Sequence, residues 1–372
     1  MNCEIEFLPV GEKSKAGDAI VVRYGTVESY ELMIVDGGHE ESGQLIVDHV
    51  REYFGQDAVI SHVVLTHSDA DHASGLRTVL SELTVNNLLL HVPWMHAADA
   101  RPYFKNKQWT DYGLQKAIWK EYDLINEIVQ IALNKQPPIS IYFPFTGTQI
   151  GPFRVLSPLK DLYTLLLPQF DRTPDPDQAA IEAEGFWIGK PPSPLAKLAE
   201  AVVAKVQKWF TESWEKERLK DGGVATASNE SSVVLYGDFG DRRVLLTGDA
   251  GVLALTLAAY YAEQNNLTLQ DFEFVQIPHH GSRRNVGPTI LNRLLGPIQP
   301  EGSPTRFPAF VSAPKDDDTH PRMMVLNAFT RRGARVVATQ GTSKIHYGGF
   351  PKRPNYCAAE IIPFTPKVED YD

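Results

Sequence analysis

The sequence predicts an α/β or α+β fold, and three observations support this prediction. Short β-branched runs that end in Gly or Asp fill the first third of the chain, with a helix-like segment between them. Long segments with helical spacing occupy the middle, and strand-like runs return after Gly222. We therefore expect a single domain over residues 1–372, with a largely helical insertion at residues 96–228.

The strand-rich parts contain most of the predicted sheet. Near the N-terminus, strands are predicted for "IEFLPV", "AIVVRY", "LMIVDGG" and "SHVVLTH", with a helix at "GQLIVDHVREYF" before the last of them. Later strands are predicted for "SSVVLYGD", "RRVLLTGD", "FEFVQIPHH", "PAFVSAP" and "ARVVATQG", with helices at 251–265, 287–295 and 321–332. Each later strand ends in polar or ionisable residues, the pattern expected when loops at one sheet edge build a site.

The middle of the chain has a different hydrophobic pattern, which is typical of helices. Apolar residues recur at helical spacing in "DYGLQKAIWKEYDLINEIVQIALN" and "SPLAKLAEAVVAKVQKWFTESWEKERLK". Residues 168–194 between them are rich in Pro and acid, which predicts a loop or a poorly ordered segment. All six tryptophans lie in or next to the insertion. They fit a small helical core, or alternatively a lid or protein-partner surface with rings available for base stacking.

Composition narrows the classes of partner and metal site. A net charge of -10 disfavours a surface that coats nucleic acid, although a local basic mouth is still compatible with it. Only Cys3 and Cys357 are present, so any metal must be held by His and carboxylates. No apolar run approaches the roughly 20 residues that cross a bilayer, and the N-terminus lacks the layout of a signal peptide. We expect a cytoplasmic protein with no membrane contact.

Potential metal ligands are concentrated in the string "THSDADH". It places four such residues within six positions, directly after an apolar run: His67, Asp69, Asp71 and His72. Imidazole and carboxylate suit Zn, Mn, Fe or Ni better than Ca or Mg alone. The plainer alternative is a solvated Asp-rich turn that caps the following helix.

Two further predicted strands end in ligand-type residues, Asp249 in "LTGD" and the pair His279 and His280 in "IPHHGS". If these loops share one sheet edge with the first cluster, a dinuclear site follows. One ion would be held by His67, Asp69 and Asp249, and the other by Asp71, His72, Asp249 and one of His279 and His280. Two cations about 3.5 to 4 Å apart lower the pKa of a shared water and stabilise charge at a reacting centre.

These strings resemble the metallo-β-lactamase superfamily, and within it the soluble hydrolase domain of bacterial competence DNA-uptake channel proteins. The matching segments run in order along the chain: "AGDAIVVRYG", "LMIVDGG", "LTHSDADHASGL", "NESSVVL", "RRVLLTGDAG", "IPHHGSRRN" and "HP" at His320. The resemblance implies a four-layer αββα sandwich. It also implies hydrolysis by hydroxide bound to a dinuclear centre of divalent ions, Zn or Mn.

Roles follow by resemblance, position by position. Asp36 matches an Asp that supports the site from behind the ligands, and Asp249 matches the bridging carboxylate. Asp69 stands where many relatives have His, which makes the centre richer in oxygen and favours Mn as well as Zn. We favour His279 as the last metal ligand and His280 as a residue that faces the substrate, but the residues alone leave this choice open.

A further His ligand of many relatives has no clear counterpart in this chain. Only His91 and His96 lie in the corresponding interval, and either could be structural. Without that ligand, the first ion would occupy a more open site.

Substrate contacts are expected from residues that flank the ligand motifs. Those predicted to bind substrate are Asn229, Ser232, Ser282, Arg283 and Lys315. Asp71, Asp249, His280 and His320 are predicted to act in catalysis. The guanidinium group of Arg283 matches phosphate oxygens in a bidentate way, which suggests an anionic substrate.

The first functional hypothesis is a phosphodiesterase or nuclease acting on a phosphate-containing small molecule or a nucleic acid. A second keeps the metal centre but changes the bond, to a carboxylic ester, lactone, thioester or phosphocholine ester. A third is a metal-bound protein without catalysis, which binds a protein partner through the helical insertion.

Overall fold

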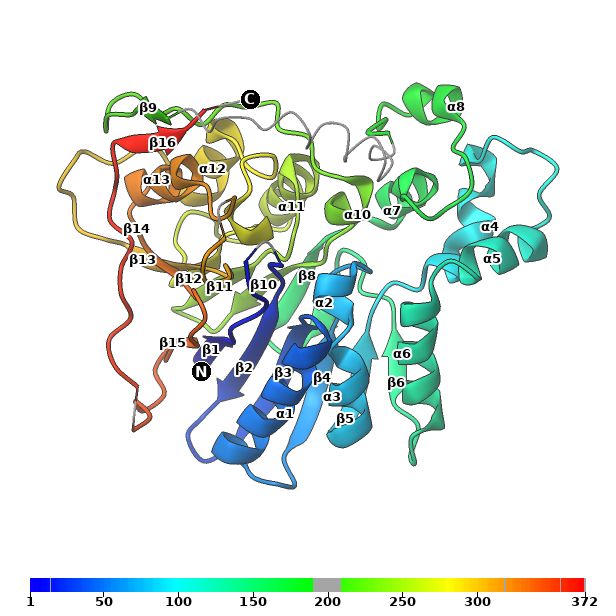
Figure 1. Cartoon of the computed structure of the whole chain (residues 1–372), viewed down its shortest axis with the longest axis horizontal. Coiled ribbons are helices and arrows are strands. Elements are labelled where there is room, and N and C mark those ends of the chain that lie inside the picture. The colour runs from blue at the N-terminus through cyan, green and yellow to red at the C-terminus, as the bar shows by residue number, and fades with distance from the viewer. Residues whose placement is uncertain (14, 190–208, 318, 355, 371–372) are drawn as a thin grey trace.

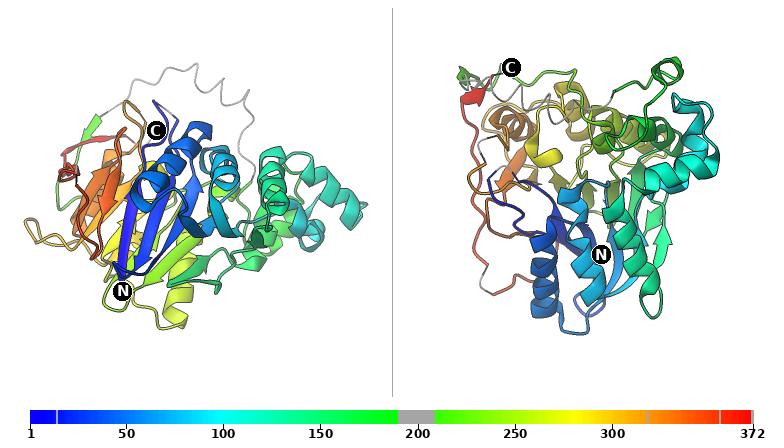
Figure 2. Two further views of the ribbon diagram at one scale, coloured as in Figure 1. Left: turned by 90° about the horizontal axis from the view of Figure 1, so that it is seen from below. Right: turned by 45° about the vertical axis from the view of Figure 1, so that its right-hand side comes forward.

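The computed structural model describes residues 1–13, 15–189, 209–317, 319–354 and 356–370. Most strands belong to two seven-stranded sheets, which face each other inside the molecule (Figures 1 and 2). Helices cover the outer face of each sheet, which gives four layers in the order helix, sheet, sheet, helix. The predicted αββα sandwich is confirmed.

The first sheet has the order β15-β1-β2-β3-β4-β5-β6. Its strands are β1 (Asn2–Phe7), β2 (Ala19–Gly25), β3 (Tyr30–Gly37), β4 (Val59–Val64), β5 (Thr84–Leu89), β6 (Ser140–Tyr142) and β15 (Lys344–His346). From β3 to β6 the neighbouring strands are parallel. Helices α1 (Glu40–Phe54) and α3 (Leu76–Glu82) pack on the outer face through buried apolar side chains.

The second sheet has the order β14-β13-β12-β11-β10-β8-β7. Its strands are β7 (Gln149–Ile150), β8 (Phe153–Ser157), β10 (Val234–Asp238), β11 (Arg243–Leu246), β12 (Phe274–Gln276), β13 (Phe307–Val311) and β14 (Ala334–Ala338). Strands β11 to β14 are parallel. The outer helices are α11 (Val252–Gln264), α12 (Pro288–Leu295) and α13 (Met323–Arg331), which confirms the three helices predicted in this part.

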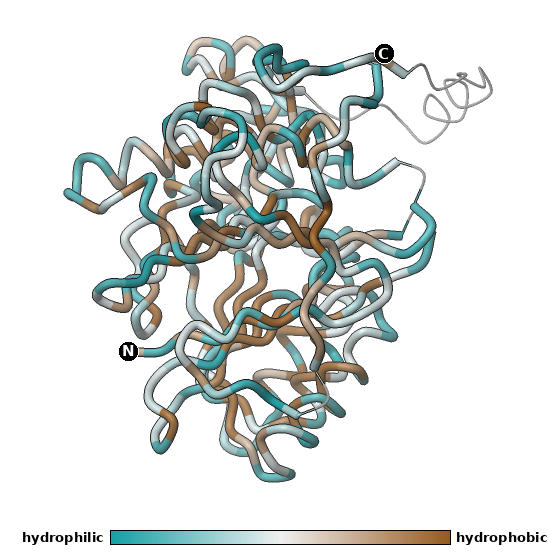
Figure 3. The backbone as a smooth tube through the Cα atoms, turned by 90° about the vertical axis from the view of Figure 1, so that its left-hand side faces the viewer, coloured by the Kyte–Doolittle hydropathy of each residue, from teal (hydrophilic) through white to brown (hydrophobic). Residues whose placement is uncertain are grey.

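The alternation of strand residues between two faces explains the layering. On β1, Ile5 and Phe7 point into the apolar layer between the sheets, where they meet Phe274 and Phe310. The opposite faces of both sheets pack against their own helices as separate clusters. Hydrophobic segments therefore run through the strands in the centre of the molecule (Figure 3).

Residues 96–228 contain both helices and strands. The helical elements are η1 (Pro93–His96), α4 (Ala97–Ala100), η2 (Arg101–Tyr103), α5 (Asp111–Trp119), α6 (Asp123–Asn134), α7 (Lys160–Leu166), η3 (Leu167–Gln169), α8 (Gln178–Ala183) and α10 (Ala227–Glu230). Three strands of the two sheets, β6, β7 and β8, lie within the same range. That residues 96–228 form an insertion within a single domain over residues 1–372 stays a prediction.

Two local predictions in this range need correction. Residues 168–189 are not all loop, because Gln178–Ala183 form α8, whose first turn is capped by the Asp177 side chain at the Ala180 N–H. The helix predicted over 193–220 lies mainly at 190–208, outside the described residues. Its described end is β9 (Trp209–Thr211), which pairs with β16 (Lys367–Glu369), so a long-range pairing overrides helical spacing there.

The membrane-crossing capacity of the helices can be stated for residues 1–13, 15–189, 209–317, 319–354 and 356–370. No helix there is both long and apolar enough to cross a membrane.

Candidate metal centre

The predicted ligands meet where strands of both sheets end. His67 follows β4, and Asp71 and His72 lie on the short helix α2 (Ala70–Ala73). Asp249 follows β11, and the His pair follows β12 in η4 (His279–Gly281). Residues separated by about 200 positions are thus brought together because the two sheets are packed with these strand ends adjacent.

The carboxylate of Asp249 lies at the middle of the cluster. Its Oδ1 is 3.3 Å from His72 Nε2 and 3.8 Å from His280 Nε2. Its Oδ2 is 3.5 Å from His279 Nε2 and 3.8 Å from His67 Nε2. Each oxygen therefore faces its own pair of imidazoles, which is the arrangement a bridging ligand requires.

The first group of ligand atoms is compact. Atoms of Asp71, His72, Asp249 and His280 all lie within 4.8 Å of one another. His72 Nε2, His280 Nε2 and Asp249 Oδ1 are buried and form no hydrogen bond with any described residue. Buried polar atoms are normally paired, so unpaired atoms that converge on one point fit a cation.

The second group lies around the other oxygen of Asp249. His67 Nε2 is 3.5 Å from Asp69 Oδ2 and is also buried without a hydrogen bond among the described residues. Ser228 Oγ donates to Asp69 Oδ1 at 2.6 Å, which directs the other carboxylate oxygen toward His67. His279 Nδ1 lies 2.8 Å from Asn285 Oδ1, and this contact leaves Nε2 to face Asp249.

His280, which we expected to face the substrate, therefore belongs to the compact group, whereas His279 faces the other oxygen of Asp249. The geometry favours a role for both histidines, one in each group. Their ring orientations are held separately, because His280 Nδ1 lies 3.1 Å from the carbonyl oxygen of Ser312.

Asp36 supports the cluster from behind. It is fully buried, its Oδ2 lies 2.8 Å from His72 Nδ1, and it accepts hydrogen bonds from the backbone N–H and hydroxyl of Thr66 at 2.7 Å each. With Nδ1–H donated to Asp36, His72 presents Nε2 to Asp249. This contact agrees with the supporting role proposed for Asp36 and fixes the tautomer of the imidazole.

Replacing Asp36 with alanine is expected to weaken metal binding by about 10- to 100-fold, because His72 loses the partner that orients it. Competition with a chelator would measure the dissociation constant for Mn or Zn. Asp48→Ala is a suitable control, since Asp48 is an exposed residue of α1 whose carboxylate contacts only Gln44 by hydrogen bond. Equal affinities for the two variants would contradict the role of Asp36.

The electrostatics of the cluster also favour a cation. Burial works against ionisation of Asp249, but His279, His72 and His280 hold its pKa well below the ordinary range. Partial burial opposes the ionisation of Asp69, whose side chain is still 44% exposed, yet the His67 imidazole lowers the pKa of Asp69 to about 2. Both carboxylates thus stay ionised, which places concentrated negative charge beside the histidines.

The cluster reaches solvent through three of its side chains. The side chains of His67, His72 and His280 are almost completely buried, whereas those of Asp69, Asp71 and His279 are 44%, 32% and 30% exposed. His320 lies next to the exposed His279, because its ring stacks on that of His279 at 24° with 6.2 Å between centroids.

The residues predicted to bind substrate have mixed positions. Asn229 Nδ2 lies 3.0 Å from His279 Nδ1, so Asn229 contacts a proposed ligand directly. Arg283 donates to the backbone oxygen of Asp370 near the C-terminus. Lys315 is exposed on a loop that pairs with Glu12. Ser232 and Ser282 are buried.

His91 and His96 lie in a different environment from the ligand cluster. Their rings pack with Phe143, Phe145 and Tyr163, and burial lowers the pKa of both imidazoles. Neither belongs to a ligand group of three or more within the part of the chain that the structure describes. We therefore give them a packing role.

Several contacting residues were not singled out by the sequence. Ser228 contacts Asp69, Asn285 contacts His279, and Asp18 has a ligand-type atom within 4.8 Å of those of Asp36 and His72. Gln276 accepts from the turn that precedes Asp249. Asp18 and Asn285 lie within strings that were matched to the superfamily, but only their spatial neighbours reveal what they contact.

Residues 17–156 match the family model described as metallo-beta-lactamase superfamily. This segment of the chain is thus similar to that superfamily, and the cluster of histidines and aspartates is suited to a metal ion. The match covers the first ligand motif and Asp36, whereas Asp249 and the His pair lie beyond it. No curated protein sequence matches the chain.

Two solved structures illustrate the likeness in fold. The metallo-beta-lactamase fold protein YhfI from Bacillus subtilis has 9% identity and a TM-score of 0.40, with 93% of this chain and 100% of that chain covered. A beta-lactamase domain protein from Burkholderia ambifaria has 14% identity and a TM-score of 0.34, with 77% and 70% covered.

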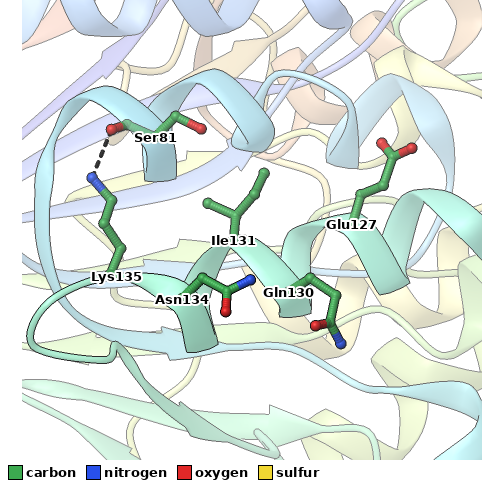
Figure 4. Close-up of a pocket in the computed structure, with 6 residues that line it drawn as sticks. All are labelled: Ser81, Glu127, Gln130, Ile131, Asn134 and Lys135. Carbon is green, nitrogen blue, oxygen red and sulfur yellow. Dashed lines mark hydrogen bonds between the residues drawn. The ribbon is translucent and has the colours of Figure 1, made fainter.

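A surface groove between α3 and α6 is separate from the ligand cluster (Figure 4). Its lining residues are Ser81, Glu127, Gln130, Ile131, Asn134 and Lys135. Lys135 Nζ donates to the backbone oxygen of Ser81 at 2.6 Å across one end of it. The groove contains none of the predicted ligands, so we assign it no part in the chemistry.

Proposed function

We propose that the chain hydrolyses phosphodiester bonds with two divalent ions, Zn or Mn, held at this centre. The observation that carries the proposal is the position of Asp249, which offers one oxygen to each of two ligand groups. Asp71, His72 and His280 would complete one group, and His67, Asp69 and His279 the other. When bound, such ions activate water and neutralise the charge that develops on the phosphoryl oxygens.

Two features favour a phosphodiester as the substrate: the number of carboxylate ligands in the centre and the position of His320 beside it. Three carboxylates suit harder ions, such as Mn, and these ions pair well with phosphate oxygens. Burial, with help from His280 and His279, lowers the pKa of His320 to about 4, so His320 is neutral near pH 7. A neutral imidazole in this position can donate one hydrogen bond to a non-bridging oxygen.

The second candidate substrate class contains a carbonyl: a carboxylic ester, lactone or thioester. One contact favours it, because Arg283, expected to bind phosphate, donates to the backbone of Asp370. The net charge of -10 also fits a small substrate better than a long nucleic acid. A protein partner on the helical region is a third candidate, supported by the exposed side chains of Met95, Tyr112 and Trp119.

A substrate panel tests the proposal. Purified protein reconstituted with Mn or Zn would be assayed with bis-p-nitrophenyl phosphate, a lactone and a thioester, and its metal content measured by elemental analysis. We expect two ions per chain and the highest kcat/KM for the phosphodiester. Preference for either carbonyl substrate would move the assignment to the second class, and inactivity on all three with a stable bound protein would favour the third.

A further inference from the structure

We propose that Gln276 and Asp18 form a buried relay that positions the bridging carboxylate of Asp249, so that both are positioning residues of the metal centre. This inference rests on the metal centre of the proposed function. It does not depend on which bond the centre cleaves.

Gln276 is the last residue of β12 and is 1% exposed. Its Oε1 accepts from the backbone N–H groups of Thr247 and Gly248, at 2.9 and 3.1 Å. Its Nε2 donates to Asp18 Oδ2 at 2.8 Å. The two ends of the amide have opposite hydrogen-bonding needs and face matching partners, so the side chain has one favourable orientation.

The turn that Gln276 holds leads directly into Asp249. Gly248 has a φ of 49°, and a Cβ there would lie 2.9 Å from the Thr66 side chain, so the turn passes tightly beside the first ligand motif. The carbonyl oxygen of Gly248 accepts from the His279 N–H at 3.2 Å. Asp249 Oδ1 has no hydrogen-bond partner among the described residues, so the backbone of this turn contributes to its position beside the His72 imidazole.

Asp18 ties this turn to the other sheet. It directly precedes β2 of the first sheet, is 1% exposed, and has a carboxylate oxygen within 4.8 Å of ligand-type atoms of Asp36 and His72. The Asp18 to Gln276 bond therefore joins the support of His72 on one sheet to the turn of Asp249 on the other. A shift in this bond would change the distance between ligands that must share one ion.

Loss of the relay is tested with Gln276→Leu, which removes all three hydrogen bonds. We expect the dissociation constant for Mn, Zn or Co, measured by chelator competition, to rise about 10- to 100-fold, with an altered absorption spectrum of bound Co. The matched control is Gln169→Leu. Buried Gln169 has the same pattern, accepting from the Ile188 and Gly189 N–H groups and donating to the Leu165 oxygen.

Gln169→Leu should lower thermal stability while metal affinity and the Co spectrum stay those of the wild type. A swap variant adds a second test that does not depend on an apolar replacement. Gln276→Glu alone places its carboxylate next to that of Asp18, and the repulsion between them should weaken metal binding. In the double variant Gln276→Glu with Asp18→Asn, the new amide at position 18 can donate a hydrogen bond to the new carboxylate at position 276. The double variant should recover most of the wild-type affinity.

Equal effects of Gln276→Leu and Gln169→Leu on affinity would overturn the relay, as would a swap variant no better than Gln276→Glu. A wild-type protein that binds none of the three ions would overturn it too. If the wild type binds metal and the variants behave as expected but no phosphodiester is cleaved, the relay stands and the proposed substrate class fails.

Discussion

Asp249→Asn is expected to reduce kcat/KM by more than about a hundredfold. Loss of a residue that only supports a metal ligand costs up to about a hundredfold, and this substitution changes the proposed ligand itself. Asparagine has nearly the same size but only one oxygen and no charge. It therefore cannot face His72 with one oxygen and His279 with another, as the carboxylate does. Elemental analysis should find fewer ions per chain than in the wild type.

The control for this variant is Asp271→Asn. Asp271 is exposed and pairs with Arg243 at 3.0 Å, so its replacement removes a charge without touching the centre. Circular dichroism should show both variants folded. Wild-type turnover in folded Asp249→Asn protein would be incompatible with a bridging role, whatever its metal content.

Glu212→Ala is expected to cost about 3 to 5 kcal/mol of unfolding free energy, the range for breaking a buried ion pair from one side. Glu212 Oε1 lies 3.2 Å from Arg331 Nη1, and both side chains are fully buried. The same carboxylate accepts from Arg218 N–H and from Asn327 Nδ2, at 2.5 Å each. Removing the Glu212 carboxylate leaves the charge of Arg331 buried without this partner. Burial already lowers the pKa of Arg331.

Chemical denaturation, followed by circular dichroism, would measure this loss. The matched control is Glu263→Ala, which breaks a pair of similar geometry, 2.7 Å to Arg293, at the surface. Exposed pairs of this kind contribute about 1 kcal/mol or less. Joint replacement by Glu212→Leu and Arg331→Met should recover part of the loss, because no charge is then left buried. A Glu212→Ala variant as stable as Glu263→Ala would contradict this account.

The outline of the fold could be predicted because local patterns in this chain agree with its tertiary structure. Helices α11, α12 and α13 lie within one or two residues of the predicted 251–265, 287–295 and 321–332. The segment 111–134 divides into two helices at Lys120 to Tyr122, although its helical spacing is continuous. Residues 209–211 became a strand because their partner, β16, lies more than 150 positions further along the chain.

The meeting of the ligand strings could be predicted because two of them, "THSDADH" and "IPHHGS", hold more ligand-type residues than a helix cap or turn needs. The choice between His279 and His280 could not, because it depends on backbone geometry: both have positive φ, 44° and 53°, and point to different oxygens of Asp249. Gln276 looked like any residue at a strand end, since its partner Asp18 is 258 positions away. The prediction that Arg283 binds substrate did not anticipate its contact with the Asp370 backbone, because Asp370 lies 87 positions away.

If Asp249 bridges two bound ions between the sheets, as proposed, the lifetime of the protein depends on metal. The compact group of ligand atoms takes Asp71 and His72 from the side of the first sheet, and Asp249 and His280 from the side of the second. An ion held by both sets acts as a cross-link, and its binding adds RT ln(1 + [L]/Kd) to the stability of the joined sheets. Metal starvation would then shorten the survival of the folded chain in the cell as well as its turnover.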